Sequence, residues 1–274
     1  MMGENELTWV ACIVYYEDPK SLKNLLENLQ SQTLKPTEIF IVDNSSNLAP
    51  ILQDAKIKID YTKLDKNLGF GAAANIGINK AIEKDYSNFI LFSQDVELEN
   101  NSCEKLITNL NLNKGITFPT MINRKNNKIF SKGGVINKLT GSIKLYTEKV
   151  PRKIYWADGS CLAFDKDTFN SLNGFYENYF MYFEDVDFCF RASIHNLKLS
   201  HVETKAWQNP NGPSPYLRSK NSIIFSRRIN SKLMSMSITK RNLLGVFLLF
   251  AKFRFADAKQ RFLGIIAGWK AQVD

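Results

Sequence analysis

The fold is decided by residues 156–192, which read WADGSCLAFDKDTFNSLNGFYENYFMYFEDVDFCFRA. The first nine residues predict a buried loop that enters a short strand. The DKDTFNSL segment that follows predicts a helix capped by Asp165 or Asp167. Asn173 and Gly174 are typical of the left-handed stop that ends such a helix. The stretch therefore predicts a strand, a capped helix and a glycine corner in close succession.

A second helix is expected to begin near Glu184, with an acidic first turn. Glu184, Asp185 and Asp187 lie in this turn, where free backbone N–H groups and the helix dipole stabilise negative charge. Three later residues fall on faces that pack inward, and Arg191 falls on a face that pairs outward. The inward residues are Phe188, Phe190 and Ala192. The acids fit either a functional site or a well-capped helix with solvated carboxylates.

The residues before this stretch alternate strands with helices. Strands are predicted over residues 7–16, 38–42, 57–64 and 89–92, and helices over residues 21–32 and 72–82. The order strand, helix, strand predicts right-handed parallel crossovers in an α/β sheet, in which ligands bind at the carboxyl ends of the strands. Asp43 lies at one of these ends. The alternative for Asp43 is a turn residue that caps the next segment.

Two loops that follow strands carry binding chemistry. Residues 66–82 place Gly69 and Gly71 before a helix, a generic anion-binding arrangement whose spacing matches neither a Walker nor a dinucleotide motif. Asp95 and Glu97 come directly after the strand over residues 89–92. Carboxylates at alternate positions can hold a hard divalent cation against a diphosphate. The alternative is a solvated loop with an acidic helix start.

Composition restricts the class of protein. A chain of 274 residues with 44% hydrophobic residues fits one α/β core with an appendage. Its four cysteines contain no CxxC pair, which indicates a reducing cytosolic compartment and neither a zinc site nor a disulfide framework. The N-terminal MMGENELTWV lacks the pattern of a secretory signal. The longest apolar run, residues 243–251, is shorter than the ~20 residues of a membrane span.

The net charge of +9 is concentrated near the C-terminus. Residues 216–274 contain twelve Lys/Arg and two Asp/Glu, which leaves the first 215 residues with a charge of −1. A nearly neutral body does not favour a nucleic-acid partner, whereas a basic tail rich in Phe and Leu indicates an anionic membrane surface. The alternative is a helical pair that covers a core or contacts a second copy in a homodimer.

Together these motifs resemble family-2 inverting glycosyltransferases of the GT-A fold, especially their bacterial rhamnosyltransferase-like branch. The similarity covers about residues 8–215. It rests on VYYE at Val14, VDNSS at Val42, NLGFGAAANIG at Asn67, FSQDVEL at Phe92 and the long stretch from Asp158. It implies a Rossmann-like, mostly parallel sheet flanked by helices in a catalytic domain over residues 1–215. A helical C-terminal region over residues 216–274 is implied as well.

The resemblance also implies roles for single residues. Asp185 matches the general base of the family, with Asp158, Gly159 and Glu184 on the acceptor side. The residues implied in donor binding are Tyr16, Asp43, Asn67, Gly69, Asn75 and Asp95. Asp95 is the residue expected to ligate Mg²⁺ or Mn²⁺ on the diphosphate of the donor.

Three positions depart from the family pattern. Glu17 replaces the usual Asn after the first strand, and Ser93 replaces an acid or Asn in the metal motif. Gln208 and Asn209 stand where many relatives have a metal-binding His. His201 is the remaining candidate ligand, and the alternative for it is a surface or core histidine.

The reaction implied is transfer of a sugar, rhamnose from dTDP-rhamnose or a sugar from a UDP donor, to a glycan. The acceptor is expected on a polyprenyl-diphosphate carrier during assembly of a bacterial surface polysaccharide, in the cytoplasm or on the inner face of the plasma membrane. A nucleotidyltransferase is disfavoured because residues 15–19 lack a Gly-rich basic signature. The other alternative is a nucleotide-sugar-binding or scaffold protein without catalysis, against which the presence of both Asp95 and Asp185 argues.

Overall fold

The computed structural model describes residues 7–47, 56–210 and 212–273. The chain divides into two compact units. The first comprises Met1–Gly134, Leu145–Phe180 and Glu184–Pro210, and the second comprises Val135–Lys144, Met181–Phe183 and Asn211–Asp274. The expectation about a signal segment falls mainly on residues 1–6, which lie outside the described residues.

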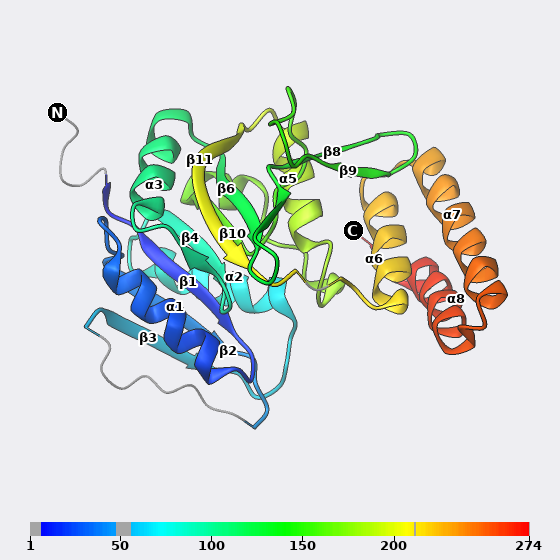
Figure 1. Ribbon diagram of the computed structural model, residues 1–274, viewed down its shortest axis with the longest axis horizontal. Helices are drawn as coiled ribbons and strands as arrows, with labels where there is room; N and C mark the ends of the chain where they lie inside the picture. The colour runs from blue at the N-terminus through cyan, green and yellow to red at the C-terminus, as the bar shows by residue number, and fades with distance from the viewer. Residues whose placement is uncertain (1–6, 48–55, 211, 274) are drawn as a thin grey trace. The chain divides into compact units, whose positions relative to one another are not determined.

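Within the described residues, the first unit is built on a nine-stranded mixed sheet (Figure 1). The strand order is β3-β2-β1-β4-β10-β6-β11-β5, with β7 on β6. The strands are β1 (Val10–Tyr15), β2 (Glu38–Asp43), β3 (Lys58–Lys63), β4 (Asn88–Ser93), β5 (Glu97–Leu98), β6 (Ile116–Asn123), β7 (Lys128–Ser131), β10 (Cys161–Asp165) and β11 (Leu199–Gln208). A separate two-stranded sheet pairs β8 (Gly134–Ile136) with β9 (Ile143–Leu145). Strands β1 to β4 pair in parallel, and β10 runs antiparallel to β4 and β6.

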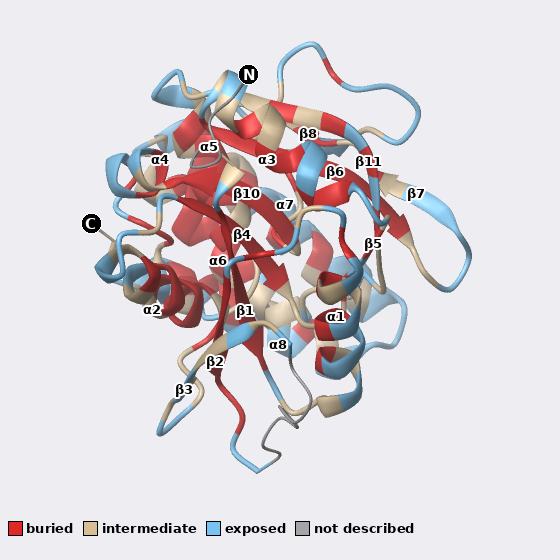
Figure 2. Cartoon of the chain, turned by 90° about the vertical axis from the view of Figure 1, so that its left-hand side faces the viewer, coloured by how far each residue is buried: buried red, intermediate tan, exposed pale blue. Residues whose placement is uncertain are grey.

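Helices cover both faces of the large sheet because successive side chains of each strand point to opposite faces. Along β1, Ala11 and Ile13 pack against α1 (Pro19–Ser31) and α3 (Ser102–Asn113), whereas Val10 and Cys12 pack with α2 (Phe70–Glu83), α4 (Lys166–Ser171) and α5 (Glu184–Ile194). Figure 2 shows the resulting band of buried residues along the central strands. The predicted mostly parallel α/β sheet flanked by helices is confirmed.

The corner that the sequence predicts between two helices is present. Asp165 caps α4 by accepting a hydrogen bond of 2.7 Å from the Thr168 N–H. Asn173 and Gly174 then take positive φ values of 52° and 66°, and α5 begins at Glu184 as expected.

The outward pairing predicted for Arg191 is wrong. Its side chain is only 13% exposed and pairs at 2.6 Å with the buried carboxylate of Asp187. It also donates to the carbonyl oxygens of Leu172 and Gly174. The physical reason is that a buried carboxylate and the free carbonyls at the end of α4 all need donors, which one guanidinium supplies.

The second unit contains three helices in its described residues, α6 (Pro215–Arg228), α7 (Lys232–Ala251) and α8 (Phe255–Lys270). They pack against one another at the end of the chain (Figure 1). In the described part of the chain, α7 is the one helix long and apolar enough to cross a membrane, and 28% of its apolar window is buried. The apolar run over residues 243–251 is the C-terminal half of this helix.

Candidate active site

Several strand ends meet at one edge of the large sheet. Tyr15 at the end of β1 lies opposite Asp43 at the end of β2, and Val14 lies opposite Ser93 at the end of β4. Because β10 is antiparallel, its beginning reaches the same edge, where Ser93 N–H donates to the Ser160 carbonyl at 3.0 Å. In α/β sheets this edge is where ligands bind.

Asp185 is held at this edge by three N–H donors. Its Oδ2 accepts hydrogen bonds from Trp156 Nε1 at 2.9 Å and from Gly159 N at 3.1 Å. Its Oδ1 accepts one from Val186 N at 2.8 Å. A Cβ on Gly159 would lie 2.8 Å from the Asp185 Cβ, so only glycine allows this approach. The carboxylate is thereby fixed in position while it stays partly exposed.

The carboxylates around Asp185 have raised pKa values. Burial raises the pKa of Asp185, the charge of Asp158 adds to this, and the hydrogen bond from Trp156 opposes it. Burial and the charge of Asp185 likewise raise the pKa of Glu184, whose Oε2 is buried without a hydrogen-bond partner in the described structure. Burial first, and then the charge of Asp95, raise the pKa of Asp158. The three buried carboxyl groups of Asp158, Glu184 and Asp185 therefore favour uptake of a proton.

Asp95 follows β4 and lies beside Gln208 at the end of β11. Gln208 Nε2 is 3.3 Å from Asp95 Oδ1 and 3.4 Å from Ser93 Oγ. Among the described residues no group of three or more His, Cys, Asp or Glu side chains is arranged to enclose a metal ion. Mg²⁺ is commonly bound through one or two carboxylates together with substrate phosphates and water. The donor set at Asp95 fits that mode of binding, and it does not form an all-protein cage.

The structure excludes His201 from this group. It lies near the start of β11, opposite Phe118, and seven residues before Gln208. At ~3.3 Å per residue this places it roughly 20 Å from the strand end that contacts Asp95. Its Nε2 is 2.8 Å from Thr120 Oγ1, and its ring packs edge-on against Phe118. A metal site that combines His201 with Asp95 is therefore wrong, and His201 is a packing residue of the sheet.

Asp43 is fully buried under polar neighbours. Its oxygens accept hydrogen bonds from Ser45 and from the Tyr61 hydroxyl, and Lys63 Nζ lies 3.2 Å away. Burial alone would raise the pKa of Asp43, but the hydrogen bonds outweigh it and lower the pKa below the ordinary value. Tyr61 and Lys63 are exposed. A ligand at this edge would meet these two side chains before it met Asp43.

Tyr16 and Gln94 join the ends of β1 and β4. The Tyr16 N–H donates to Gln94 Oε1 at 2.6 Å, and Gln94 Nε2 donates to the Tyr16 carbonyl at 2.8 Å. The Tyr16 side chain is 47% exposed. The backbone of Tyr16 is thus fixed, and its ring is free to contact a ligand.

The glycine-rich loop is shorter than expected because α2 already begins at Phe70. Gly69 has φ 89°, and a Cβ there would lie 2.1 Å from the Phe180 carbonyl oxygen, so the position requires glycine. Asn67 Oδ1 accepts the Gly69 N–H at 2.9 Å, and Asn44 binds both Leu68 N and the Gly69 carbonyl. The loop is therefore anchored to the end of β2.

The donor-binding role implied for Asn75 is wrong. Asn75 lies within α2 and is buried. Its Oδ1 accepts the Phe175 N–H at 2.8 Å, and its Nδ2 donates to the Phe175 carbonyl at 2.8 Å and to Glu177 Oε1 at 2.9 Å. The amide is used to fasten the glycine corner to α2, because the turn that follows Gly174 leaves backbone groups without partners.

The backbone directly before Glu184 takes an unusual conformation. Three aromatic residues there have positive φ, a region that bulky side chains rarely adopt. They are Phe180 (66°), Tyr182 (66°) and Phe183 (79°). Within the second unit, Asn221 Nδ2 donates to the carbonyl oxygens of Met181 and Tyr182, both at 2.8 Å. Such conformations cluster at functional sites, where surrounding contacts hold them in place.

Sequence reasoning missed two residues of the site. Trp156 stands in the deciding stretch, but nothing in the sequence indicates that its indole binds Asp185. Gln208 stands where many members of the family have a metal-binding His. This correspondence was the one sequence signal that could have placed Gln208 beside Asp95.

Comparison with known proteins identifies the family. Residues 10–172 match the family model for glycosyl transferase family 2. The low-salt glycan biosynthesis hexosyltransferase Agl10 of Haloferax volcanii is 24% identical over 203 residues, which cover 70% of this chain and 63% of that protein. The dTDP-rhamnosyl transferase RfbF of Shigella flexneri is 27% identical over 202 residues, which cover 72% of this chain and 67% of that protein.

Solved structures share the fold. The crystal structure of S. aureus TarS has a TM-score of 0.60 and 16% identity, and the match covers 88% of this chain and 43% of that one. The complex of TarS residues 1–349 with UDP-GlcNAc gives a TM-score of 0.59 over 85% of this chain and 69% of that one. The fold is GT-A. Because the family model spans more than half of its residues, the chain belongs to glycosyl transferase family 2.

Proposed function

We propose that the chain is an inverting hexosyltransferase that uses a nucleotide-diphosphate sugar, with Asp185 as general base. The observation that carries this proposal is the fixed carboxylate of Asp185, which accepts hydrogen bonds from Trp156 Nε1 and Gly159 N and has a raised pKa. A base whose pKa lies closer to the working pH transfers protons more effectively.

In the proposed step an acceptor hydroxyl gives its proton to Asp185, and its oxygen bonds to the anomeric carbon of the donor sugar. The bond between that carbon and the diphosphate oxygen breaks at the same time, and the nucleoside diphosphate leaves with the electron pair. Attack from the face opposite the leaving group inverts the anomeric centre. Glu184, Asp158 and Gly159 shape the acceptor side around the base.

Tyr16, Asn67 and Gly69 are proposed to contact the donor nucleotide, and Asp43 acts behind Tyr61 and Lys63. Asp95, with Gln208 beside it, would hold Mg²⁺ or Mn²⁺ against the diphosphate. When bound, such an ion supplies positive charge that stabilises the leaving group. The chain itself contributes Asp95 as the anchoring carboxylate, and Arg124 fixes the Asp95 carbonyl by donating to it at 3.0 Å.

The donor is proposed to be dTDP-rhamnose or a UDP-sugar. Support comes from RfbF, whose name states a dTDP-rhamnosyl transferase, and from TarS, which was crystallised with UDP and UDP-GlcNAc. The acceptor is proposed to be a polyprenyl-diphosphate-linked glycan of a surface polysaccharide, reached at the cytoplasmic face of the membrane. A thermal-shift panel of dTDP- and UDP-sugars, with and without Mn²⁺, selects the donor class.

The test of the reaction is transfer by Asp185→Asn. This variant is expected to bind nucleotide as the wild type does but to lose transfer by at least about a hundredfold, the usual scale for loss of a general base. Asp167→Asn, at an exposed first-turn position of α4, is the matched control with unchanged turnover. Product NMR reports the anomeric configuration. Near-wild-type turnover in Asp185→Asn would remove Asp185 from the mechanism. If the wild-type protein binds the donor but neither hydrolyses nor transfers it, a non-catalytic binding protein is favoured.

A further inference from the structure

Helices α7 and α8 of the second unit carry many large apolar side chains on their exposed side and polar or small residues on part of their buried side. Phe247 and Leu248 of α7 are 70% and 63% exposed. The buried side of α7 mixes apolar with polar and small residues, namely Met234, Ser235, Ile238, Asn242 and Gly245. On α8 the buried residues are Ala258, Gly264, Ile265 and Gly268, and most of the larger apolar residues face outward. The exposed ones are Phe255, Phe262, Leu263, Ile266 and Trp269. A helix that packs in water normally shows the opposite pattern.

Small and polar residues make several of the contacts among α6, α7 and α8. Gly264 lies against Tyr216, where a Cβ would be 2.3 Å from the carbonyl oxygen, and Gly268 lies against Lys220 in the same way. Asn242 Oδ1 accepts from Arg261 at 3.1 Å, and Asn242 Nδ2 donates to Ser222 Oγ at 3.2 Å. Close packing through small residues, with polar side chains linking helices, is typical of helices whose outer surface contacts lipid.

Arg261 is not a free surface cation, because its guanidinium lies over Gly245 and binds Asn242. The exposed lysines near the apolar side chains are Lys232, Lys240, Lys252, Lys259 and Lys270. Asp257 is the one acidic residue of residues 216–273, and Arg254 binds it at 2.7 Å. The exposed charge of this unit is therefore almost entirely positive.

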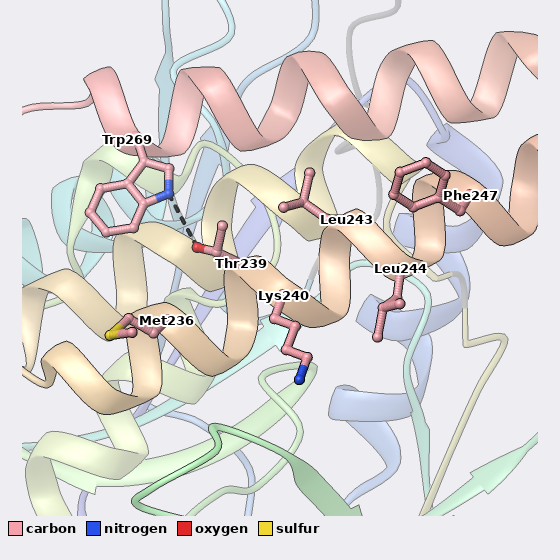
Figure 3. A pocket seen from close by; sticks show the side chains of 7 residues that line it. All are labelled: Met236, Thr239, Lys240, Leu243, Leu244, Phe247 and Trp269. Carbon is pink, nitrogen blue, oxygen red and sulfur yellow. Dashed lines mark hydrogen bonds between the residues drawn. The ribbon is translucent and has the colours of Figure 1, made fainter.

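An apolar groove of about 380 Å³ lies between α7 and α8. Figure 3 shows Met236, Leu243 and Phe247 of α7 together with Trp269 of α8, whose indole donates to Thr239 at 3.1 Å. Lys240 lines the same groove. The groove thus combines flexible apolar side chains with a cation. A surface that contacts both acyl chains and anionic headgroups requires this combination.

We propose that the exposed face of α7 and α8 inserts into the interfacial region of an anionic phospholipid membrane. A second copy of the chain fits this face less well, because a two-fold contact would bring the lysines of both copies together without acidic partners. Spanning the bilayer is disfavoured because Lys240 and Arg241 lie at the middle of α7. If the proposed function holds, this face is the surface by which the enzyme reaches a lipid-linked acceptor. The exposed apolar residues and lysines of α7 and α8 that support membrane insertion are independent of the active site.

The experiment is sedimentation of the full chain with vesicles of phosphatidylglycerol and phosphatidylcholine, compared with phosphatidylcholine alone. Wild type is expected to pellet with the anionic vesicles only. The pair Lys252→Glu and Lys259→Glu should lower binding at least about tenfold, since each basic residue contributes about a fivefold gain in affinity near such a surface. Lys125→Glu with Lys128→Glu, at exposed positions of the first unit, makes the same charge change and should bind as wild type.

Apolar insertion is tested with Phe247→Ser and Leu248→Ser together. This variant should bind the vesicles at low salt and be released by 0.5 M NaCl, whereas wild type should be partly retained. At this salt concentration the Debye length is ~4 Å, so most of the charge attraction is screened. Leu112→Ser with Ile194→Ser, both exposed in the first unit, is the control. Brominated lipids should quench a fluorescence component that is lost in Trp269→Phe.

Three results would overturn the proposal. The first is wild type that stays in the supernatant with anionic vesicles. The second is an equal loss of binding in the Lys125/Lys128 control. The third is a dimer, measured by light scattering, that dissociates in the Phe247/Leu248 variant, which would make the face a contact between copies. Nucleotide binding measured on the same preparations distinguishes each of these from failure of the proposed enzymatic function.

Discussion

The indole Nε1 of Trp156 donates a hydrogen bond of 2.9 Å to Oδ2 of Asp185. A residue in the loop before β10 thereby orients the carboxylate at the start of α5. The bond also stabilises the charged form of Asp185 against burial, so its loss has a predictable sign.

Trp156→Phe is expected to raise the pKa of Asp185 further, because the variant keeps the ring but lacks the donor. A general base must be deprotonated, so the acid limb of kcat moves to higher pH by about one unit, the scale of a hydrogen bond to a charged group. Activity near neutral pH falls and recovers at higher pH. A pH–rate profile measures this shift. Trp207→Phe, which loses only a bond to Asn127, is the control, and an acid limb that stays at the wild-type pH would contradict the prediction.

Gly159→Ala is expected to lower kcat by roughly tenfold to a hundredfold with unchanged affinity for the donor. The new Cβ would lie 2.8 Å from the Asp185 Cβ, so α5 or the loop must shift, and misplacement of a catalytic group by about 1 Å has an effect of that size. Steady-state kinetics separate kcat from donor KM. Gly212→Ala, whose Cβ would meet nothing closer than 3.6 Å, should behave as wild type. A Gly159→Ala enzyme with normal kcat would mean that Asp185 tolerates displacement.

Asp95→Ala is expected to weaken binding of a nucleoside diphosphate only when Mg²⁺ or Mn²⁺ is present, because Asp95 would anchor the ion. Calorimetric titration with Mn²⁺ and with EDTA measures the difference. Glu83→Ala, at the exposed end of α2, is the control. Equal weakening in EDTA would assign Asp95 a structural role instead.

Asn75→Ala is expected to lower the free energy of unfolding by about 1–3 kcal/mol and to leave the donor KM unchanged. The substitution leaves the N–H and carbonyl of Phe175 buried without partners, which has a cost of this size. Chemical denaturation and initial-rate kinetics supply the two measurements. Asn79→Ala, on the exposed side of α2, should change neither. A raised donor KM in Asn75→Ala at unchanged stability would restore a donor-binding role.

The local sequence pattern was sufficient to predict the strands and helices that have a strong hydrophobic pattern or clear capping residues. The continuous apolar runs of β1, β2 and β4 predict central parallel strands, and they form them. Asp165, Asn173 and Gly174 predict where α4 begins and ends because capping and left-handed turns depend on neighbouring residues alone. The first turn of α5 likewise places Asp185 at a helix start.

Strand pairing in the folded protein determined the strands that the local sequence pattern did not predict. β6 carries Pro119 within a buried strand, and the register of β11 shifts between His201 and Lys205 opposite this residue. Proline has no N–H to give to the ladder, so the neighbouring strand must bulge. Two strands about eighty residues apart pair in this way, and neither one alone predicts the other.

The same division holds for the site. The sequence by itself determined that acids follow a strand end and begin a helix, and the structure places Asp95 and Asp185 at those positions. The roles expected for these two residues came from the family resemblance. The sequence did not determine that Trp156 binds Asp185, that Gln208 lies beside Asp95 or that the amide of Asn75 faces Phe175. The identity of an Asn, Gln or Trp does not reveal whether its polar group binds a ligand or another part of the protein. The direction of that group is set by side-chain packing between segments that are distant in the chain.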